Sequence, residues 1–152
     1  MNITYICRQM VLLLHGEIRR LGPDGEFREV YGNLPADFDP FRRDENFLRE
    51  VLSREPKSVP DLFSERDFIY YGILRLENGE ILLAGPVRVS EDGADLAQYM
   101  QAQHHLCGDG SYKLPYCDLR SFSNGLLLLF HLLTGKEVEY SGLLEETSVG
   151  VG

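Results

Sequence analysis

The sequence is poor in basic residues and has no long hydrophobic run, and each shortage argues against a class of protein. Only 15 Lys and Arg stand against 24 Asp and Glu, which gives a net charge of −9. A domain that binds nucleic acid needs a basic face to neutralise phosphates, so we expect this chain not to bind it directly. We interpret the basic pairs Arg19-Arg20 and Arg42-Arg43, which lie near acidic residues, as solvated surface. No apolar run is longer than Leu126 to Phe130, which is far below the ~18 residues that a membrane span needs.

Cysteine is also scarce. Cys7, Cys107 and Cys117 are an odd number, and no two of them form a C-x-x-C pair. This usage is typical of a reducing compartment rather than of a secreted, disulfide-bonded domain. The first ten residues mix polar and apolar side chains, and no small-residue cleavage site follows, so the sequence predicts no signal peptide. We therefore expect a cytoplasmic protein.

Residue patterns for catalysis or metal binding are weak. His104, His105, Cys107 and Cys117 lie close in sequence, but structural zinc sites typically include a C-x-x-C pair. The simpler interpretation is a polar helix end with Cys117 as a small buried side chain. A cysteine nucleophile is the alternative, because Cys107 has His104 and Asp109 nearby. None of the usual phosphate-loop, dinucleotide, zinc-protease or nucleophile-elbow motifs is present, so we predict no enzyme, metal or cofactor.

The length of 152 residues and 43% hydrophobic content predict one domain, residues 1–140, followed by a linker-like tail over 141–152. Hydrophobic periodicity and turn residues predict helices over 3–14, 39–53 and 118–133, with a further helix after residue 90. Strands are predicted at 17–21, 26–31, 59–62 and in the hairpin 67–89, with an extended piece at 112–116. This order predicts an α+β fold: an antiparallel sheet of about five strands with helices on its faces.

The hairpin 67–89 carries the strongest local signal, Asn78-Gly79 between two apolar runs. A two-residue type I′ turn with positive φ at both residues predicts the pairing of Leu74 with Leu83 and of Gly72 with Gly85. Two opposed glycines would leave a notch in the side-chain layer. Either a small ligand lies in that notch, or a helix or bulge packs closely against it, and the sequence leaves both alternatives open.

The notch and the last helix supply the candidate functional residues. Tyrosine suits a mostly apolar pocket because it adds a hydroxyl to apolar area. The candidate ligand-binding residues are Tyr70, Gly72, Leu74, Leu83, Gly85, Val87 and Tyr116. The helix 118–133 is apolar on most sides, which is typical of a helix buried on several sides or shared with a second copy. The candidate dimer interface is Leu119, Phe122, Leu126, Leu129 and Leu133.

Two stretches of the sequence resemble a known family. They run from Phe68-Ile-Tyr-Tyr-Gly-Ile-Leu-Arg-Leu to Leu82-Leu-Ala-Gly-Pro-Val87, and from Leu114-Pro-Tyr-Cys-Asp-Leu to Thr134-Gly135. They are similar to the N-terminal sensor region of AraC-type bacterial transcriptional regulators, and the order of elements resembles PAS and GAF sensor domains. The resemblance covers most of residues 67–135.

In that family the sensor region precedes a DNA-binding domain with two helix-turn-helix units, which we expect this chain to lack. The resemblance thus implies a regulatory domain that senses a small-molecule effector, forms a homodimer and contacts DNA only through another domain. It supplies no catalytic residues. The alternatives are a dimerisation module without a ligand, or a small cytosolic cysteine-dependent enzyme.

Overall fold

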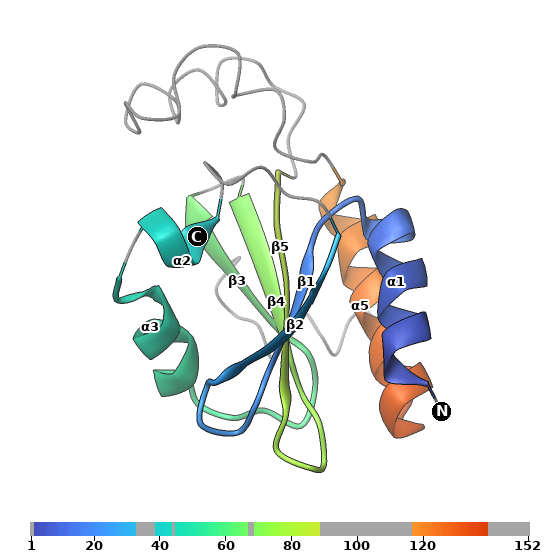
Figure 1. Ribbon diagram of the computed structural model, residues 1–152. Helices are drawn as coiled ribbons and strands as arrows, with labels where there is room; N and C mark the ends of the chain where they lie inside the picture. The colour runs from blue at the N-terminus through green and yellow to red at the C-terminus, as the bar shows by residue number, and fades with distance from the viewer. Residues whose placement is uncertain (1, 33–38, 44, 67–68, 89–116, 140–152) are drawn as a thin grey trace.

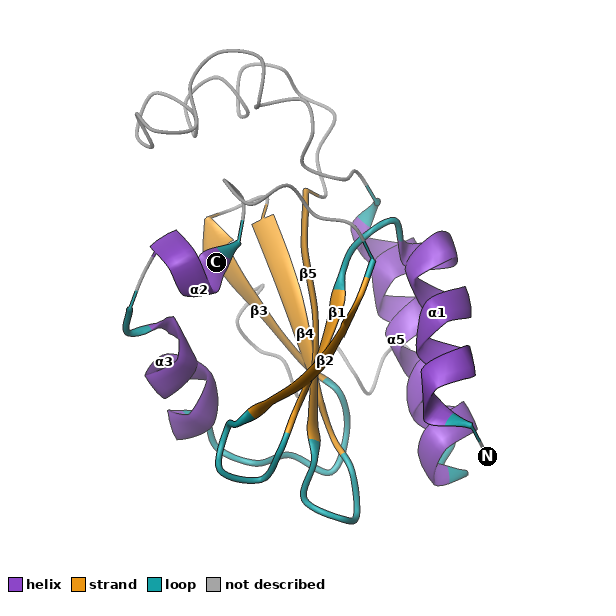
Figure 2. Ribbon diagram, viewed as in Figure 1, coloured by secondary structure: helices purple, strands orange, loops and turns teal. Residues whose placement is uncertain are grey.

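The computed structural model describes residues 2–32, 39–43, 45–66, 69–88 and 117–139 (Figure 1). They form a five-stranded antiparallel sheet with helices on both faces (Figure 2), which confirms the predicted α+β class. The helices are α1 (Ile3–Leu14), α2 (Pro40–Arg43), α3 (Phe47–Ser53) and α5 (Leu119–Thr134). The strands are β1 (Ile18–Leu21), β2 (Phe27–Tyr31), β3 (Asp61–Arg66), β4 (Ile69–Arg75) and β5 (Ile81–Arg88). The predicted helix after residue 90 and the extended piece at 112–116 lie outside the described residues.

The strand order is β2-β1-β5-β4-β3, so the N-terminal hairpin lies beside the last strand. β1 pairs with β5, with Ile18 opposite Ala84 and Leu21 opposite Ile81. This contact joins residues about 60 positions apart in sequence. It brings the start of β5 close to Arg20, and so it creates the polar site described below.

One face of the sheet is covered by α1 and α5, which lie side by side and antiparallel (Figure 1). The predicted stripe of α1 is buried there: Ile6, Cys7, Met10 and Leu14. The predicted bounds of the last helix are also confirmed. The Asp118 side chain caps its start by accepting a hydrogen bond from the Ser121 N–H at 3.2 Å, and Gly135 ends it with a φ of 78°.

The other face is covered by α2 and α3, where the sequence predicted one helix over 39–53. The start is as expected, because the Asp39 carboxylate accepts a hydrogen bond from the Phe41 N–H at 3.0 Å. The chain then leaves the helix after Arg43 and re-enters it at Phe47. Phe47 packs on Tyr71 with ring centroids 5.2 Å apart, and Tyr71 stacks on Phe63 at 5.0 Å. An aromatic core therefore fills the space between α3 and the sheet.

The turn between β4 and β5 differs from the predicted two-residue type I′ turn. The Leu76 N–H donates to the Glu80 carbonyl at 2.9 Å, and the Gly79 N–H donates to the Leu76 carbonyl at 3.0 Å. Gly79 has a φ of 89°, but Asn78 is not in the left-handed region. The loop therefore spans three residues, and the pairing near the turn shifts by one.

This shift changes which side chains of β5 face which layer. Leu74 lies opposite Leu82 instead of Leu83, and Gly72 lies opposite Ala84 instead of Gly85. Because side chains alternate along a strand, a shift of one residue moves Leu83 from the predicted face to the other. Leu83 thus packs with the α3 core.

A bulge further along β5 restores the predicted pairing. Gly85 has a φ of 112° and is followed by a cis peptide bond to Pro86. Beyond it, Tyr70 lies opposite Val87, as the sequence predicted. Gly85 also has backbone atoms close by, since an added Cβ would lie 2.7 Å from the Tyr70 carbonyl oxygen. Gly85 therefore serves the geometry of the sheet.

Candidate functional site

The predicted glycine notch is occupied by protein. Gly72 and Gly85 are not opposite each other, because the shifted register places Ala84 across from Gly72. The space above Gly72 is filled by Leu126 of α5, whose side chain would clash with any added Cβ. Of the two alternatives that the sequence left open, the described residues show close helix packing at Gly72 and a bulge at Gly85.

The other candidate ligand-binding residues that the structure describes are divided between the two faces of the sheet. Tyr70, Leu74 and Val87 are buried in the core beneath α1 and α5. Leu83 is buried on the opposite face of the sheet. Tyr116 lies outside the described residues.

The predicted dimer stripe on α5 is wrong as a surface for a second copy. Phe122, Leu126 and Leu129 are fully buried, and Leu119 and Leu133 are partly buried against the same core. The reason is that α5 is flanked by both the sheet and α1, so its wide apolar face packs inside the chain. The remaining exposed leucine of α5, Leu128, lies outside this stripe.

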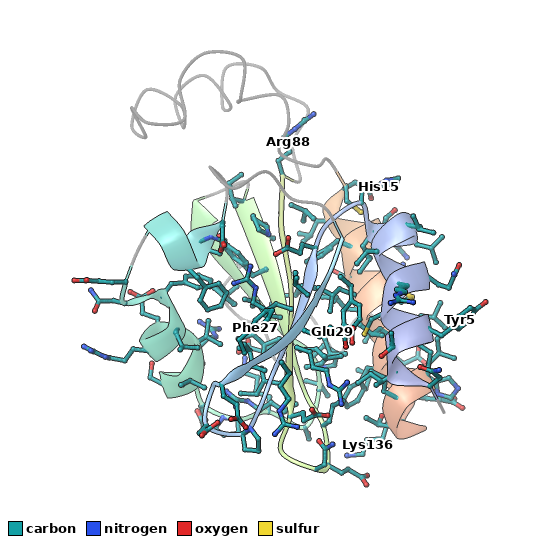
Figure 3. The ribbon with its side chains drawn as sticks, in the orientation of Figure 1. Tyr5, His15, Phe27, Glu29, Arg88 and Lys136 are labelled. Carbon is teal, nitrogen blue, oxygen red and sulfur yellow. The ribbon has the colours of Figure 1, made fainter. Side chains whose placement is uncertain are left out.

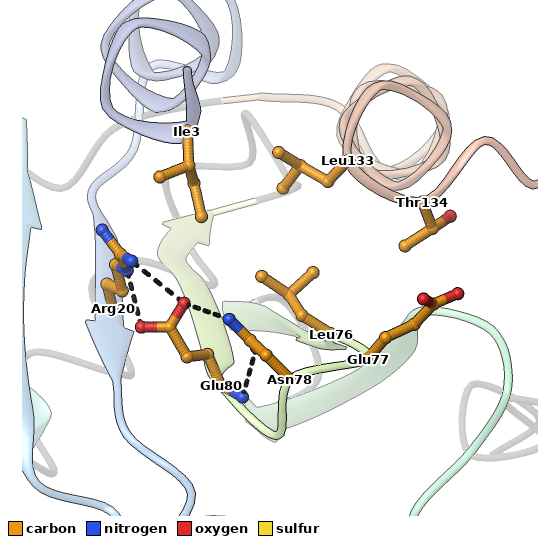
Figure 4. Close-up of a pocket in the computed structure, with 8 residues that line it drawn as sticks. All are labelled: Ile3, Arg20, Leu76, Glu77, Asn78, Glu80, Leu133 and Thr134. Atoms are coloured by element: carbon orange, nitrogen blue, oxygen red, sulfur yellow. Dashed lines mark hydrogen bonds and ion pairs between the residues drawn. The ribbon is translucent and has the colours of Figure 1, made fainter. Parts of the chain in front are cut away.

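The described residues form a pocket elsewhere, where the start of α1 and the end of α5 meet the β4–β5 turn (Figure 4). Its volume is about 390 Å³, within the range of small-molecule sites. It is lined by Ile3, Arg20, Leu76, Glu77, Asn78, Glu80, Leu133 and Thr134. Figure 4 shows Ile3 and Leu133 pointing from the two helices toward Leu76, with Arg20 and Glu80 on a second wall.

The polar wall is built around Glu80, which is only 3% exposed. Arg20 donates two hydrogen bonds to its carboxylate, from Nε to Oε2 at 2.9 Å and from Nη2 to Oε1 at 3.0 Å. Arg28 Nη1 lies 3.3 Å from Oε2, and Asn78 Nδ2 donates to Oε1 at 3.0 Å. The hydrogen bond from Arg20, helped by the one from Asn78 and by the charge of Arg28, holds the pKa of Glu80 below its ordinary value.

The charges of this wall are therefore paired within the protein. The Arg20 guanidinium has its pKa raised chiefly by the same hydrogen bond to Glu80, so it stays charged at all ordinary pH values. The interpretation of Arg20 as solvated surface is wrong. Arg20 meets Glu80 because β1 pairs with β5, and the sequence alone does not reveal this strand order.

The apolar wall and the rim complete the pocket. Ile3, Leu76 and Leu133 are partly buried and present hydrocarbon to the hollow. Glu77 is exposed at the rim, and the Thr134 hydroxyl donates to the Phe130 carbonyl at 2.7 Å. One wall is hydrocarbon and the other is polar, so the pocket suits a small amphipathic molecule rather than a metal ion or a fully polar one.

The described thiols do not suit nucleophilic catalysis. Burial raises the pKa of Cys7 to about 11 and also raises that of Cys117. A nucleophilic cysteine needs the opposite shift, because the thiolate is the reactive form. His104, His105 and Cys107 lie outside the described residues. Among the residues that are described, no group of three or more His, Cys, Asp or Glu could hold a metal ion, and no helix is long and apolar enough to cross a membrane.

Comparison of the chain with protein-family models, with curated proteins and with solved structures gives no match. The fold and the pocket geometry are therefore the basis for assigning a function.

Proposed function

We propose that this chain is the regulatory domain of an AraC-type transcriptional regulator with a PAS/GAF-like sandwich. An amphipathic effector would bind in the pocket where α1 and α5 meet the β4–β5 turn, which we call the turn pocket. The five-stranded antiparallel sheet with helices on both faces supports the fold part of this proposal. We propose the effector site at the ends of the helices instead of at the glycine notch, because Leu126 fills that notch.

One observation carries the proposal: the pocket is lined by both helices of one layer and by the sheet. Ile3 comes from α1, Leu133 and Thr134 come from α5, and Arg20 and Leu76 come from the sheet side. A molecule in this pocket would contact all three, so its binding free energy depends on how α5 sits relative to the sheet. In the family resemblance, a DNA-binding domain follows this helix along the chain. A ligand shifts such an equilibrium only by its difference in affinity for the two arrangements.

The proposal is tested with a thermal-shift screen of small amphipathic molecules. A ligand at 100 times its Kd stabilises the folded state by ~2.7 kcal/mol, which is readily seen as a rise in Tm. We expect stabilising compounds for the wild-type protein and for Leu128→Trp, because Leu128 is exposed on α5 and does not line the pocket. Leu133→Trp fills the pocket and should abolish the shift. A shift that survives in Leu133→Trp would place the ligand elsewhere.

The second candidate function is a dimerisation module without a ligand. It is favoured by apolar side chains that remain exposed on the helical layer, Leu12 and Leu13 of α1 and Leu128 of α5. A protein that dimerises but gives no shift with any compound would support this candidate over the first.

A further inference from the structure

We propose that β2 is a dimerisation edge, and that it pairs antiparallel with β2 of a second copy of this chain. The proposed interface lies at the edge of the sheet, on residues of β2 that do not line the turn pocket. It can therefore hold whether or not the pocket binds an effector.

The first observation is exposure at the edge. β2 is the outermost strand on its side of the sheet and pairs with β1 alone among the described strands. Phe27 is 59% exposed and Val30 is 40% exposed. An edge strand offers unpaired backbone groups to another strand, and exposed apolar side chains along it add to the attraction. The opposite edge, β3, has no exposed large apolar side chain among its described residues.

The second observation is how side chains divide between the two faces of β2. Val30 lies opposite Arg19 and Phe27 lies opposite Leu21, which packs in the core beneath α3. Paired residues share a face, so Phe27 and Val30 both lie on the α3 side. Figure 3 shows Phe27 on this side of the strand and Glu29 on the side of α1.

Arg28 and Glu29 both lie on the α1 side because the strand is bulged there. The pairing skips Arg28, since Arg20 lies opposite Glu29 and Leu21 opposite Phe27. Arg28 reaches Glu80 at 3.3 Å, and Glu29 accepts a hydrogen bond from the Tyr31 hydroxyl at 2.8 Å. The edge thus carries an apolar pair on one face and an opposite-charge pair on the other.

This pattern is self-complementary in one antiparallel register. With a two-fold axis between Arg28 and Glu29, Arg28 faces Glu29 of the second copy, and Phe27 faces its Val30. The two-fold axis repeats each of these pairs. In each pair the two residues lie on the same face of the sheet, Arg28 and Glu29 on the α1 side and Phe27 and Val30 on the α3 side. An axis through Arg28 would place it opposite Arg28 of the second copy, and an axis through Glu29 would do the same for Glu29. Like charges would then repel. The charge pattern therefore selects a second copy as the partner and sets its register.

The area available is modest. A strand of five residues buries less than the ~1,200 Å² of a standard interface, so we expect a reversible dimer that depends on concentration. The rival surface is the exposed apolar part of α1, which includes Leu12. The two surfaces lie on different elements, and so variants can separate them.

Sedimentation velocity over a range of protein concentrations tests the inference. We expect the wild type to dimerise, Val30→Lys to raise the dimer Kd at least ~10-fold (about 1.4 kcal/mol) and Leu12→Lys to leave it unchanged. Both positions are exposed, so both variants should fold, and circular dichroism checks this. A wild type that stays monomeric at millimolar concentration would overturn the inference. So would loss of the dimer in Leu12→Lys but not in Val30→Lys.

A second variant tests the register. Glu29→Arg places a cation opposite Arg28 of the second copy, so we expect the dimer Kd to rise at low salt. High salt shortens the range of this repulsion, and the Kd should fall again between ~0.05 and ~1 M ionic strength. An unchanged Kd for Glu29→Arg at low salt would contradict the proposed register.

Discussion

At the scale of single residues, Glu80 is the most constrained side chain of the candidate site. It follows the β4–β5 turn directly, and it also lies beside β1 because β1 pairs with β5. Five interactions satisfy its carboxylate and its N–H: two from Arg20, one from Arg28 and a reciprocal pair with Asn78. A carboxylate this buried would destabilise the fold if it lost those partners.

The substitution Glu80→Gln tests this account. The folded pKa of Glu80 lies below its unfolded value of ~4.3, so its stabilisation is fully present above that value. It is lost as the pH falls through the folded pKa. We expect Glu80→Gln to lower the free energy of unfolding by ~2 kcal/mol at pH 7 and to remove part of the acid-side loss.

Urea denaturation between pH 7 and pH 2 measures both effects. Glu26→Gln is the matched control, because Glu26 contacts the same Arg28 at 2.9 Å but in an exposed pair. Exposed pairs contribute ~0–1 kcal/mol, so this control should stay near the wild type. An identical pH profile for Glu80→Gln and the wild type would contradict the role assigned to Glu80.

At the scale of elements, the connection from α3 to β3 depends on a second buried carboxylate. Asp61 is 4% exposed, and Arg54 holds it with contacts of 2.7 and 3.0 Å. Arg54 also lies over the Phe63 ring at 4.5 Å, and its carbonyl accepts a hydrogen bond from Arg75 at 3.1 Å. One arginine therefore ties the end of α3 to both β3 and β4.

We predict that Asp61→Asn loosens this connection. Removing the acid of a buried ion pair costs ~3 kcal/mol, because its cations, here Arg54 and Lys57, lose their counter-charge. Urea denaturation gives the magnitude, and hydrogen exchange should show faster exchange in β3 than in β1. Glu55→Gln is the control, since Glu55 is exposed in the same connection. Equal stability of the two variants would show that the Arg54–Asp61 pair has no such role.

At the scale of the whole molecule, two cores share one sheet. The larger lies beneath α1 and α5, and the smaller lies beneath α2 and α3. β4 and β5 contribute to both, since Leu74 and Leu82 face one core while Ile73 and Leu83 face the other. A sheet buried on both faces cannot lose one layer without exposing strands that support the other. The chain should therefore behave as one cooperative unit.

Two core substitutions test this cooperativity. Leu129→Ala removes a buried side chain from the larger core, and Leu83→Ala does so in the smaller core. Each should lower the free energy of unfolding by ~2–5 kcal/mol. Each should also shift the whole transition, with circular dichroism and tyrosine fluorescence changing together. Separate transitions for the two probes would show that the layers unfold independently.

Sequence reasoning succeeded where structure depends on neighbouring residues. The bounds of α1 follow from apolar spacing, and those of α5 follow from apolar spacing and from the cap Asp118, which acts within one turn. It failed where a local choice had distant consequences. The Asn78-Gly79 signal placed the hairpin correctly, but a loop of three residues instead of two shifted Leu83 to the other face. The length of a hairpin loop depends on how both strands pack. A two-residue turn signal such as Asn78-Gly79 does not contain that information.

The sequence by itself determined the fold class, the main helices and the existence of the central hairpin, because periodicity and capping are short-range properties. Only the tertiary structure decided what fills the notch at Gly72 and where the pocket lies. Leu126 and Gly72 meet although they lie more than 50 residues apart in sequence, and Arg20 meets Glu80 across a strand pairing of similar separation. Such contacts depend on strand order and on how α5 packs. Strand order and helix packing are set by the burial of both faces of the sheet at once, and no local segment determines them.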